Sequence, residues 1–107
     1  MDTPSSDEQS LLEREPIVET FRRPANVKIL TVLNDAGSSA LTVSEIVEQT
    51  DISRQAFYDN KDILLKYGLI EEAEKAGNAT RYAVDLASDE VQAFMELRDT
   101  LIDAAGE

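Results

Sequence analysis

The sequence predicts a small, mainly α-helical domain with one β-hairpin and a long C-terminal helix, and three observations support this prediction. Apolar residues recur at helical spacing in four segments. Two of these segments are separated only by residues 50–52, and after residue 68 the apolar period shortens toward two, as in strands. With 107 residues, of which 42% are hydrophobic, the chain is long enough for one modest core.

End signals define the first two predicted helices. Pro24 stands where prolines commonly begin helices, and Gly37 can end one in a left-handed conformation, so we expect a helix over 24–36. Thr42 followed by Glu45 forms a capping box, which predicts a second helix that stops near Thr50.

The third predicted helix follows almost at once. Ser53 is a candidate N-cap for a helix from Arg54 to Tyr67, and Gly68 can end it. Asp51 tolerates the left-handed backbone that such a tight corner needs. Two helices joined by a three-residue turn are typical of a helix-turn-helix.

The remaining segments complete the predicted organisation. Residues 69–75 and 79–86 are expected to pair as a hairpin, and Ser88 to cap a last helix over about 88–104. Residues 1–15 are polar and acidic, and we expect a largely disordered tail. Residues 16–107 then form the folded domain, which begins with a brief apolar segment.

The sequence excludes most enzyme chemistry. The chain has no Cys and no His, so it offers no thiolate or imidazole nucleophile or base and no ordinary zinc site. It also lacks paired carboxylates, EF-hand spacing and a glycine-rich phosphate loop. We therefore expect a non-enzyme without metal or cofactor. Its short apolar runs and acidic start also predict a cytoplasmic protein with no membrane partner.

Charge is unevenly distributed along the chain. A formal net charge of −12 would ordinarily argue against nucleic acid as a partner. Residues 54–81, however, contain five basic and five acidic residues, so all of the net charge lies outside this segment. Chance clustering in a short chain is the alternative explanation, and the segment's structural pattern has to support any role in binding.

The local sequence resembles a known family. Residues 41–72, LTVSEIVEQTDISRQAFYDNKDILLKYGLIEE, are similar to the helix-turn-helix of MarR- and PadR-like transcriptional regulators. The resemblance covers about residues 25–86, and Leu64 with the Gly68-Leu69-Ile70 segment is its most diagnostic part. Acidity and a low lysine count, four Lys against six Arg, resemble the small winged-helix regulators of haloarchaea in particular. Lys61 departs from the pattern, because the family usually buries a leucine there.

This resemblance implies a winged helix-turn-helix with an additional C-terminal helix. The helix from Ser53 is then the recognition helix, whose first residues meet base edges in the major groove, while the hairpin contacts the backbone or minor groove. Arginine can bind guanine and glutamine can bind adenine, each through two hydrogen bonds. The alternatives are a solvated helix face and an ordinary turn. The candidate DNA-binding residues are Thr42, Ser44, Ser53, Arg54, Gln55, Tyr58, Lys61, Lys75, Asn78, Thr80 and Arg81.

The last helix carries more apolar residues than a narrow stripe needs, which predicts a partner surface. In the resembling families the terminal helices form a two-fold dimer, so that paired recognition helices read a palindrome. Alternatively, the apolar N-terminal segment covers this helix within one chain. The candidate dimer residues are Ile17, Val18, Phe21, Val91, Phe94, Leu97, Leu101 and Ile102.

The function predicted from the sequence is therefore a homodimeric, sequence-specific regulator that binds double-stranded DNA. A winged helix that binds another protein through its acidic surface, without direct DNA contact, is the alternative.

Overall fold

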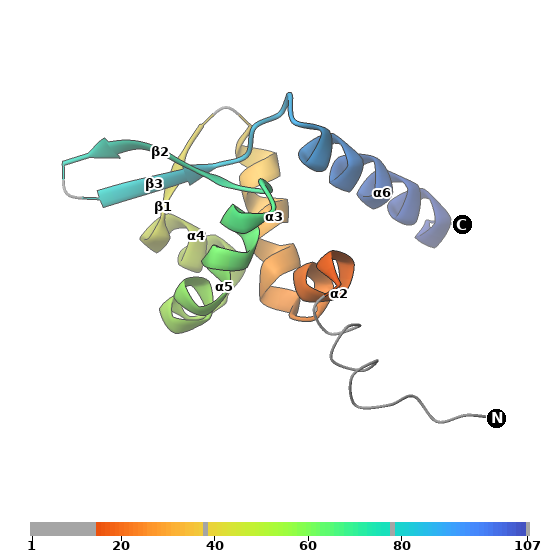
Figure 1. Cartoon of the computed structure of the whole chain (residues 1–107), viewed down its shortest axis with the longest axis horizontal. Coiled ribbons are helices and arrows are strands. Elements are labelled where there is room, and N and C mark those ends of the chain that lie inside the picture. Colours follow the sequence, from red (N-terminus) through yellow and green to blue (C-terminus); the bar gives the residue numbers. More distant parts are fainter. Residues whose placement is uncertain (1–14, 38, 78, 107) are drawn as a thin grey trace.

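The computed structural model describes residues 15–37, 39–77 and 79–106, except for the side chains of residues 74–76. The predicted tail therefore lies almost entirely outside the described residues. The elements are helices α2 (Pro16–Phe21) and α3 (Pro24–Ala36), strand β1 (Leu41–Thr42), helices α4 (Val43–Thr50) and α5 (Arg54–Lys66), strands β2 (Glu71–Ala76) and β3 (Ala79–Ala83), and helix α6 (Asp89–Ala105). The predicted mainly α-helical class is confirmed (Figure 1).

The predicted helix starts are present. The Thr42 hydroxyl accepts a hydrogen bond from the Glu45 N–H at 3.2 Å, and the Glu45 carboxylate accepts one from the Thr42 N–H at 2.8 Å. The Ser53 and Ser88 hydroxyls each accept a bond from the N–H three residues on, at 3.0 and 3.1 Å. Pro24 occupies the first turn of α3. These local bonds satisfy N–H groups that have no partner within the helix.

The turn between α4 and α5 has the predicted geometry. Asp51 adopts φ 64° and ψ 20°, the left-handed conformation. The Thr50 hydroxyl donates to the carbonyl of Ile46 at 2.6 Å and so satisfies an acceptor at the end of α4. Gly68 has φ 72° and ends the helical backbone after α5, as predicted.

The sheet differs from the predicted two-stranded hairpin. It has three antiparallel strands in the order β1-β3-β2, with Leu41 opposite Tyr82 and Thr42 opposite Arg81. The predicted strands were also too long. Residues 69 and 70 donate backbone bonds to the carbonyl of Leu64, at 2.9 and 3.4 Å, so they close the end of α5 instead of extending β2. After Ala83 the chain leaves the sheet for α6.

The core lies where α3, α4 and α5 meet the sheet. Phe57 of α5 is fully buried, and its ring lies 5.0 Å from the Tyr82 ring of β3 in an edge-on arrangement. Ile29, Leu33 and Ile46 are likewise completely inaccessible to solvent. Burial of these side chains fixes α5 against the sheet and leaves its opposite face toward solvent.

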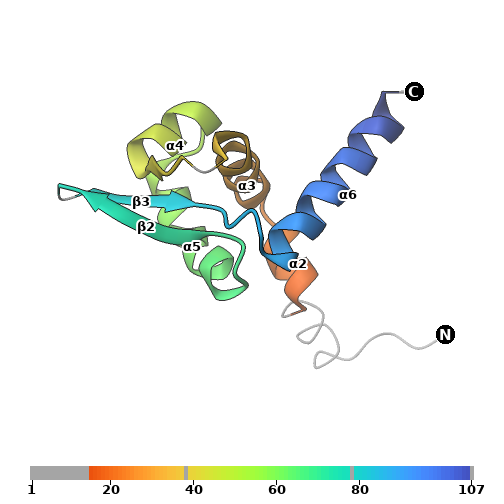
Figure 2. The same cartoon turned by 90° about the horizontal axis from the view of Figure 1, so that it is seen from above.

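The short apolar segment before α3 forms helix α2. The Asn26 amide, 1% exposed, donates to the Thr20 carbonyl at 2.9 Å and joins α2 to α3. The Phe21 ring stacks on the Phe94 ring of α6, with centroids 6.3 Å apart. This segment thus covers part of α6 within the chain, while α6 extends away from the other helices (Figure 2). No helix among the described residues is long and apolar enough to cross a membrane.

Candidate nucleic-acid interface

A groove of about 480 Å³ lies between the start of α4, the outer face of α5 and the hairpin of β2 and β3, which is the wing of this fold. Six candidate DNA-binding residues from four separate elements, β1, α4, α5 and β3, meet there. They are Thr42, Ser44, Arg54, Tyr58, Lys61 and Thr80, and Val43, Glu72, Ala79 and Tyr82 complete the lining.

Arg54 and Ser44 connect the two helices of the helix-turn-helix. Both residues are exposed, and the Arg54 guanidinium donates a hydrogen bond to the Ser44 hydroxyl. Within the described part of the chain this is the guanidinium's single hydrogen bond. An arginine has five N–H donors, so this one bond orients the group and leaves donors for a ligand in the groove.

Tyr58 and Gln55 occupy different positions on α5. The Tyr58 side chain is 48% exposed and lies edge-on to the buried Phe57 ring, with centroids 5.6 Å apart. Gln55 is exposed but does not line the groove, and its amide donates to the Asp59 carboxylate at 2.7 Å. That bond uses one of the two N–H donors of the amide, and the other stays available.

Lys61 lines the groove and is partly buried. Its side chain is 23% exposed, and its ammonium lies 3.4 Å from the Asp62 carboxylate. Burial alone lowers the pKa of Lys61, but the hydrogen bond to Asp62 and nearby acidic groups outweigh burial and raise it. Lys61 therefore stays cationic, and its half-buried stem occupies the position where the resemblance implies leucine.

Sequence reasoning missed two polar groups in the groove. Tyr82 is buried in the core, yet part of it lines the groove, and burial raises the pKa of its phenol so that the hydroxyl stays protonated. Glu72 adds a carboxylate beside Arg54 and Lys61 in the lining. The acidic residues at 71, 72 and 74 are visible in the sequence, but which of them faces α5 depends on the register of β2 against β3.

Arg81 lies at the base of the sheet, whereas the sequence predicted it beside the wing tip. Its guanidinium donates to the Ala40 carbonyl at 3.2 Å and lies 3.4 Å from the Glu45 carboxylate. The hydrogen bond from the Thr42 backbone, followed by the Thr42 side chain and the Arg81 charge, lowers the pKa of Glu45. The side chain of Lys75 and all of Asn78 lie outside the described residues.

The candidate dimer residues fall into two groups. Val91 and Phe94 are only 2% and 9% exposed and belong largely to the chain's own core, which leaves Val91 almost no area for a partner. Leu97, Leu101 and Ile102 are 46%, 58% and 52% exposed, and they line an apolar hollow of about 430 Å³ beside α6. Ile17 is also exposed, whereas Val18 and Phe21 are half-buried.

The described residues contain no cluster of three or more acidic side chains that could hold a metal ion.

No family model matches the chain, and no curated protein matches it in sequence. Solved structures do match. Reduced HlyU from Vibrio cholerae superposes with a TM-score of 0.63 at 23% identity, over 89% of this chain and 94% of that one. NolR from Sinorhizobium fredii gives 0.65 at 17% identity, over 94% and 96%.

A third similar structure is the homodimeric winged helix-turn-helix DNA-binding domain of Mb0332 from Mycobacterium bovis, described as a possible ArsR-family transcriptional regulator. It gives a TM-score of 0.60 at 20% identity, over 96% of this chain and 91% of that one. These superpositions show that the fold is the winged helix-turn-helix with a C-terminal helix, as the sequence predicted. None of the three is described as a MarR or PadR protein.

Proposed function

We propose that the protein is a sequence-specific regulator that binds double-stranded DNA as a homodimer. The observation that carries this proposal is the groove between α4, α5 and β3, where Ser44, Arg54, Tyr58 and Thr80 bring hydrogen-bonding groups to one surface. The winged helix-turn-helix fold supports the same function, because its second helix commonly enters the major groove.

The roles of the groove residues follow from their contacts. Arg54 lies in the first turn of α5, exposed, with one bond to Ser44, so its guanidinium can turn to guanine N7 and O6. Tyr58, one turn later, presents its hydroxyl to a phosphate or a base edge. Lys61 supplies a second cation that lines the groove.

The wing supplies a second contact region in this proposal. Thr80 lines the groove from β3, and Gly77 has a positive φ of 65° at the turn, so the main chain can approach a duplex closely. Arg81 contributes indirectly, because its bonds to Ala40 and Glu45 hold β3 beside α4.

The dimer is proposed through α6. Leu97, Leu101 and Ile102 form an exposed apolar surface on a helix that projects from the domain (Figure 2). Burial of these side chains against a second copy removes apolar area from water and pairs two recognition helices across a two-fold axis. A palindromic site is the DNA counterpart of that symmetry.

The net charge of −12 supports a working environment of high salt, as in the haloarchaeal regulators that the sequence resembles. It also favours the second candidate function, a protein-binding module. Glu72 in the groove and the Asp59 carboxylate on Gln55 place negative charge close to the proposed DNA surface. A basic protein surface would complement those groups.

Selection from a library of random DNA duplexes tests the proposal. The full chain is incubated with the library in dilute buffer and in about 1 M KCl, where the Debye length is roughly 3 Å. We expect enrichment of an inverted repeat in at least one condition, and weaker enrichment with the variant Arg54→Ala. Failure of the wild-type chain to enrich any sequence in either condition would favour the protein-binding module.

A further inference from the structure

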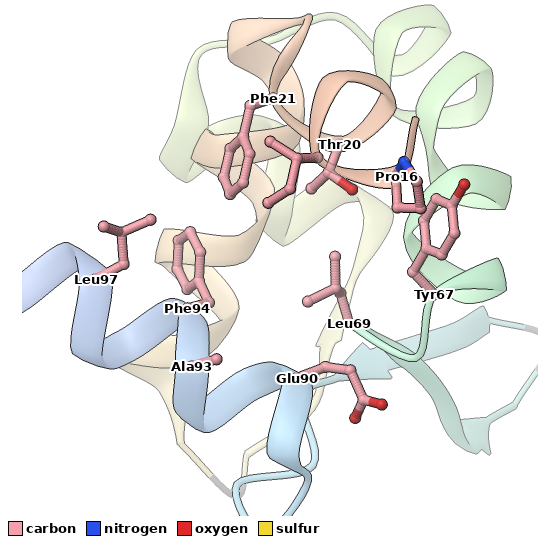
Figure 3. Close-up of a pocket in the computed structure, with 10 residues that line it drawn as sticks. Pro16, Thr20, Phe21, Tyr67, Leu69, Glu90, Ala93, Phe94 and Leu97 are labelled. Atoms are coloured by element: carbon pink, nitrogen blue, oxygen red, sulfur yellow. The ribbon is translucent and has the colours of Figure 1, made fainter. Parts of the chain in front are cut away.

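A second, separate pocket of about 370 Å³ lies between α2, the end of α5 and the first half of α6. Figure 3 shows side chains of α2 and of the α5 end on one side, and those of α6 on the other. Its volume is in the range of sites that bind small organic molecules. Thr20, 5% exposed, and Leu69, 8% exposed, form part of its wall.

The pocket has a distinctive polarity. Three of its lining residues are aromatic, Phe21, Tyr67 and Phe94, and the rest are small or apolar except for Thr20 and Glu90. Glu90 is the single charged residue in the lining. No Lys or Arg lines the pocket, and the chain has no His.

The Glu90 carboxylate has no compensating cation within the described part of the chain. It forms no ion pair there, and its side chain accepts none of the hydrogen bonds of that part. The group lies over the turn after α5, because its carboxyl carbon is 3.9 Å from the place where a Cβ on Gly68 would stand. Glu90 is an exposed residue, so a solvent-accessible, unpaired carboxylate lines one side of an otherwise apolar pocket.

We propose that this pocket binds an apolar organic cation, such as an aryl-substituted ammonium compound. The apolar part of the ligand is removed from water among the side chains of α2 and α6. Its positive charge is attracted by the Glu90 carboxylate and by the unstacked faces of the Phe21 and Phe94 rings, whereas the Tyr67 ring already has the Lys66 ammonium 5.0 Å from its centroid. A carboxylate or phosphate ligand is disfavoured by Glu90 and by the protein's net charge of −12.

The position of the pocket gives the ligand a regulatory role, which rests on the proposed function. Tyr67 is the C-cap of α5, and its hydroxyl donates to the Glu19 carboxylate of α2. A ligand that contacts Tyr67, Phe21 and Phe94 thus contacts the end of the proposed recognition helix, α2 and the proposed dimer helix together. Occupancy couples the angle of α6 to the position of α5, and so changes the separation of two recognition helices in a dimer.

The pocket is distinct from the hollow assigned to the second copy. The stacked rings of Phe21 and Phe94 line both cavities, and Leu97 is shared, but Leu101 and Ile102 line only the hollow farther along α6. Glu90, Tyr67 and Leu69 line only the pocket. Ile17, another candidate dimer residue, also lines the pocket, so the proposal requires the second copy to pack on Leu101 and Ile102 and not on α2.

Isothermal titration of the full chain without DNA tests the ligand class. The probes are benzyltrimethylammonium, phenylacetate and the uncharged isostere neopentylbenzene. We expect benzyltrimethylammonium to bind one per chain and more tightly than the other two. Glu90→Gln should weaken this binding about fivefold, the size expected for loss of one partly exposed charge pair. The matched variant Glu96→Gln, an exposed carboxylate on the same helix that does not line the pocket, should leave it unchanged.

A second variant tests the location. Ala93→Phe places a ring in the pocket and should abolish binding of the probe, while thermal melting shows that the chain still folds. Equal binding of the neutral isostere with no effect of Glu90→Gln would overturn the cation assignment. An apparent affinity that falls as protein concentration rises would show that a second copy fills the pocket, and would also overturn it.

The regulatory step has its own measurement. Saturating benzyltrimethylammonium should change the affinity of the chain for a selected duplex at least twofold, and should have no effect on Ala93→Phe. Probe binding without any change in DNA affinity would overturn the regulatory role. Because titration is done without DNA, failure of the proposed DNA binding leaves the ligand result interpretable.

Discussion

The substitution Arg54→Ala separates DNA recognition from folding. Arg54 is exposed at the start of α5, and its one hydrogen bond in the described part of the chain goes to the exposed Ser44 hydroxyl. Loss of an exposed contact of this kind changes the free energy of unfolding by no more than about 0.5 kcal/mol. The melting temperature should therefore stay close to that of the wild type.

The effect on DNA affinity is larger. A two-bond contact between arginine and guanine contributes roughly 1–3 kcal/mol of discrimination. The free protein must first give up the exposed bond to Ser44, which costs no more than about 0.5 kcal/mol. The net loss on the selected site is then about 0.5–3 kcal/mol, or roughly 2- to 150-fold in Kd, with relaxed preference at one base pair.

Fluorescence anisotropy on the selected duplex and on single-base variants measures both quantities. Lys28→Ala, a change at an exposed residue of α3 that lines neither the groove nor the hollow beside α6, is the matched control for loss of one positive charge. The two variants should differ clearly on the selected site and little on unrelated DNA. Equal affinity loss for both would refute the placement of Arg54 against a base, and an unchanged base preference would do the same.

Three further predictions concern assembly, salt and pH. Leu101→Asp should give a folded monomer by light scattering, because Leu101 is 58% exposed and its change spares the core, whereas Thr100→Asp on the same helix should keep the dimer mass. The melting midpoint should rise from dilute buffer to about 1 M KCl as screening relieves repulsion within a chain of net charge −12, and a fall would contradict a high-salt environment. Hydrogen bonds to Thr42 lower the pKa of Glu45 from 4.5, so the ionised carboxylate contributes fully to stability above pH 4.5, and this contribution is lost as the pH falls through the lowered pKa. Glu45→Gln should therefore make the stability of the protein less dependent on pH in this acidic range. Identical acid-unfolding profiles for the variant and the wild type would contradict the capping contact.

The sequence was informative wherever structure depends on neighbours along the chain. The Thr42 capping box, the Ser53 and Ser88 N-caps and the left-handed Asp51 all act within four residues, and all four were predicted correctly. Propensity and capping rules describe such short-range bonds directly. Helix order and the turn followed from them.

Contacts between distant residues could not be predicted in the same way. Strand β1 has only two residues, and it exists because Leu41 meets Tyr82 across the sheet. The contact of Glu19 with Tyr67 spans 48 positions, and no spacing rule indicates it. Arg81 was assigned to the wing tip because its bonds to the Ala40 segment depend on a pairing that the sequence does not display.

The candidate site shows the same division. Arg54 and Tyr58 were identified from their places on one helix, and the structure does bring them to a common groove. Gln55, the residue between Arg54 and Ala56, faces away from that groove toward Asp59. Packing across the whole fold decides which side-chain rotamers and which wing residues complete the groove surface.

The contacts of Arg81 with Ala40 and Glu45 join β3 to the start of α4 and so help to set the distance between the wing and the helix-turn-helix. One carboxylate, that of Glu45, holds both the first turn of α4 and the guanidinium on β3. This shared carboxylate joins the base of the wing to the first turn of α4, whereas β2 and β3 change register between Ala73 and Ala76, beyond the bridge. A duplex in the groove would meet a preset distance between its two points of contact. Sequences whose groove width matches that distance would bind without distortion, and only the outer hairpin would adjust to the rest.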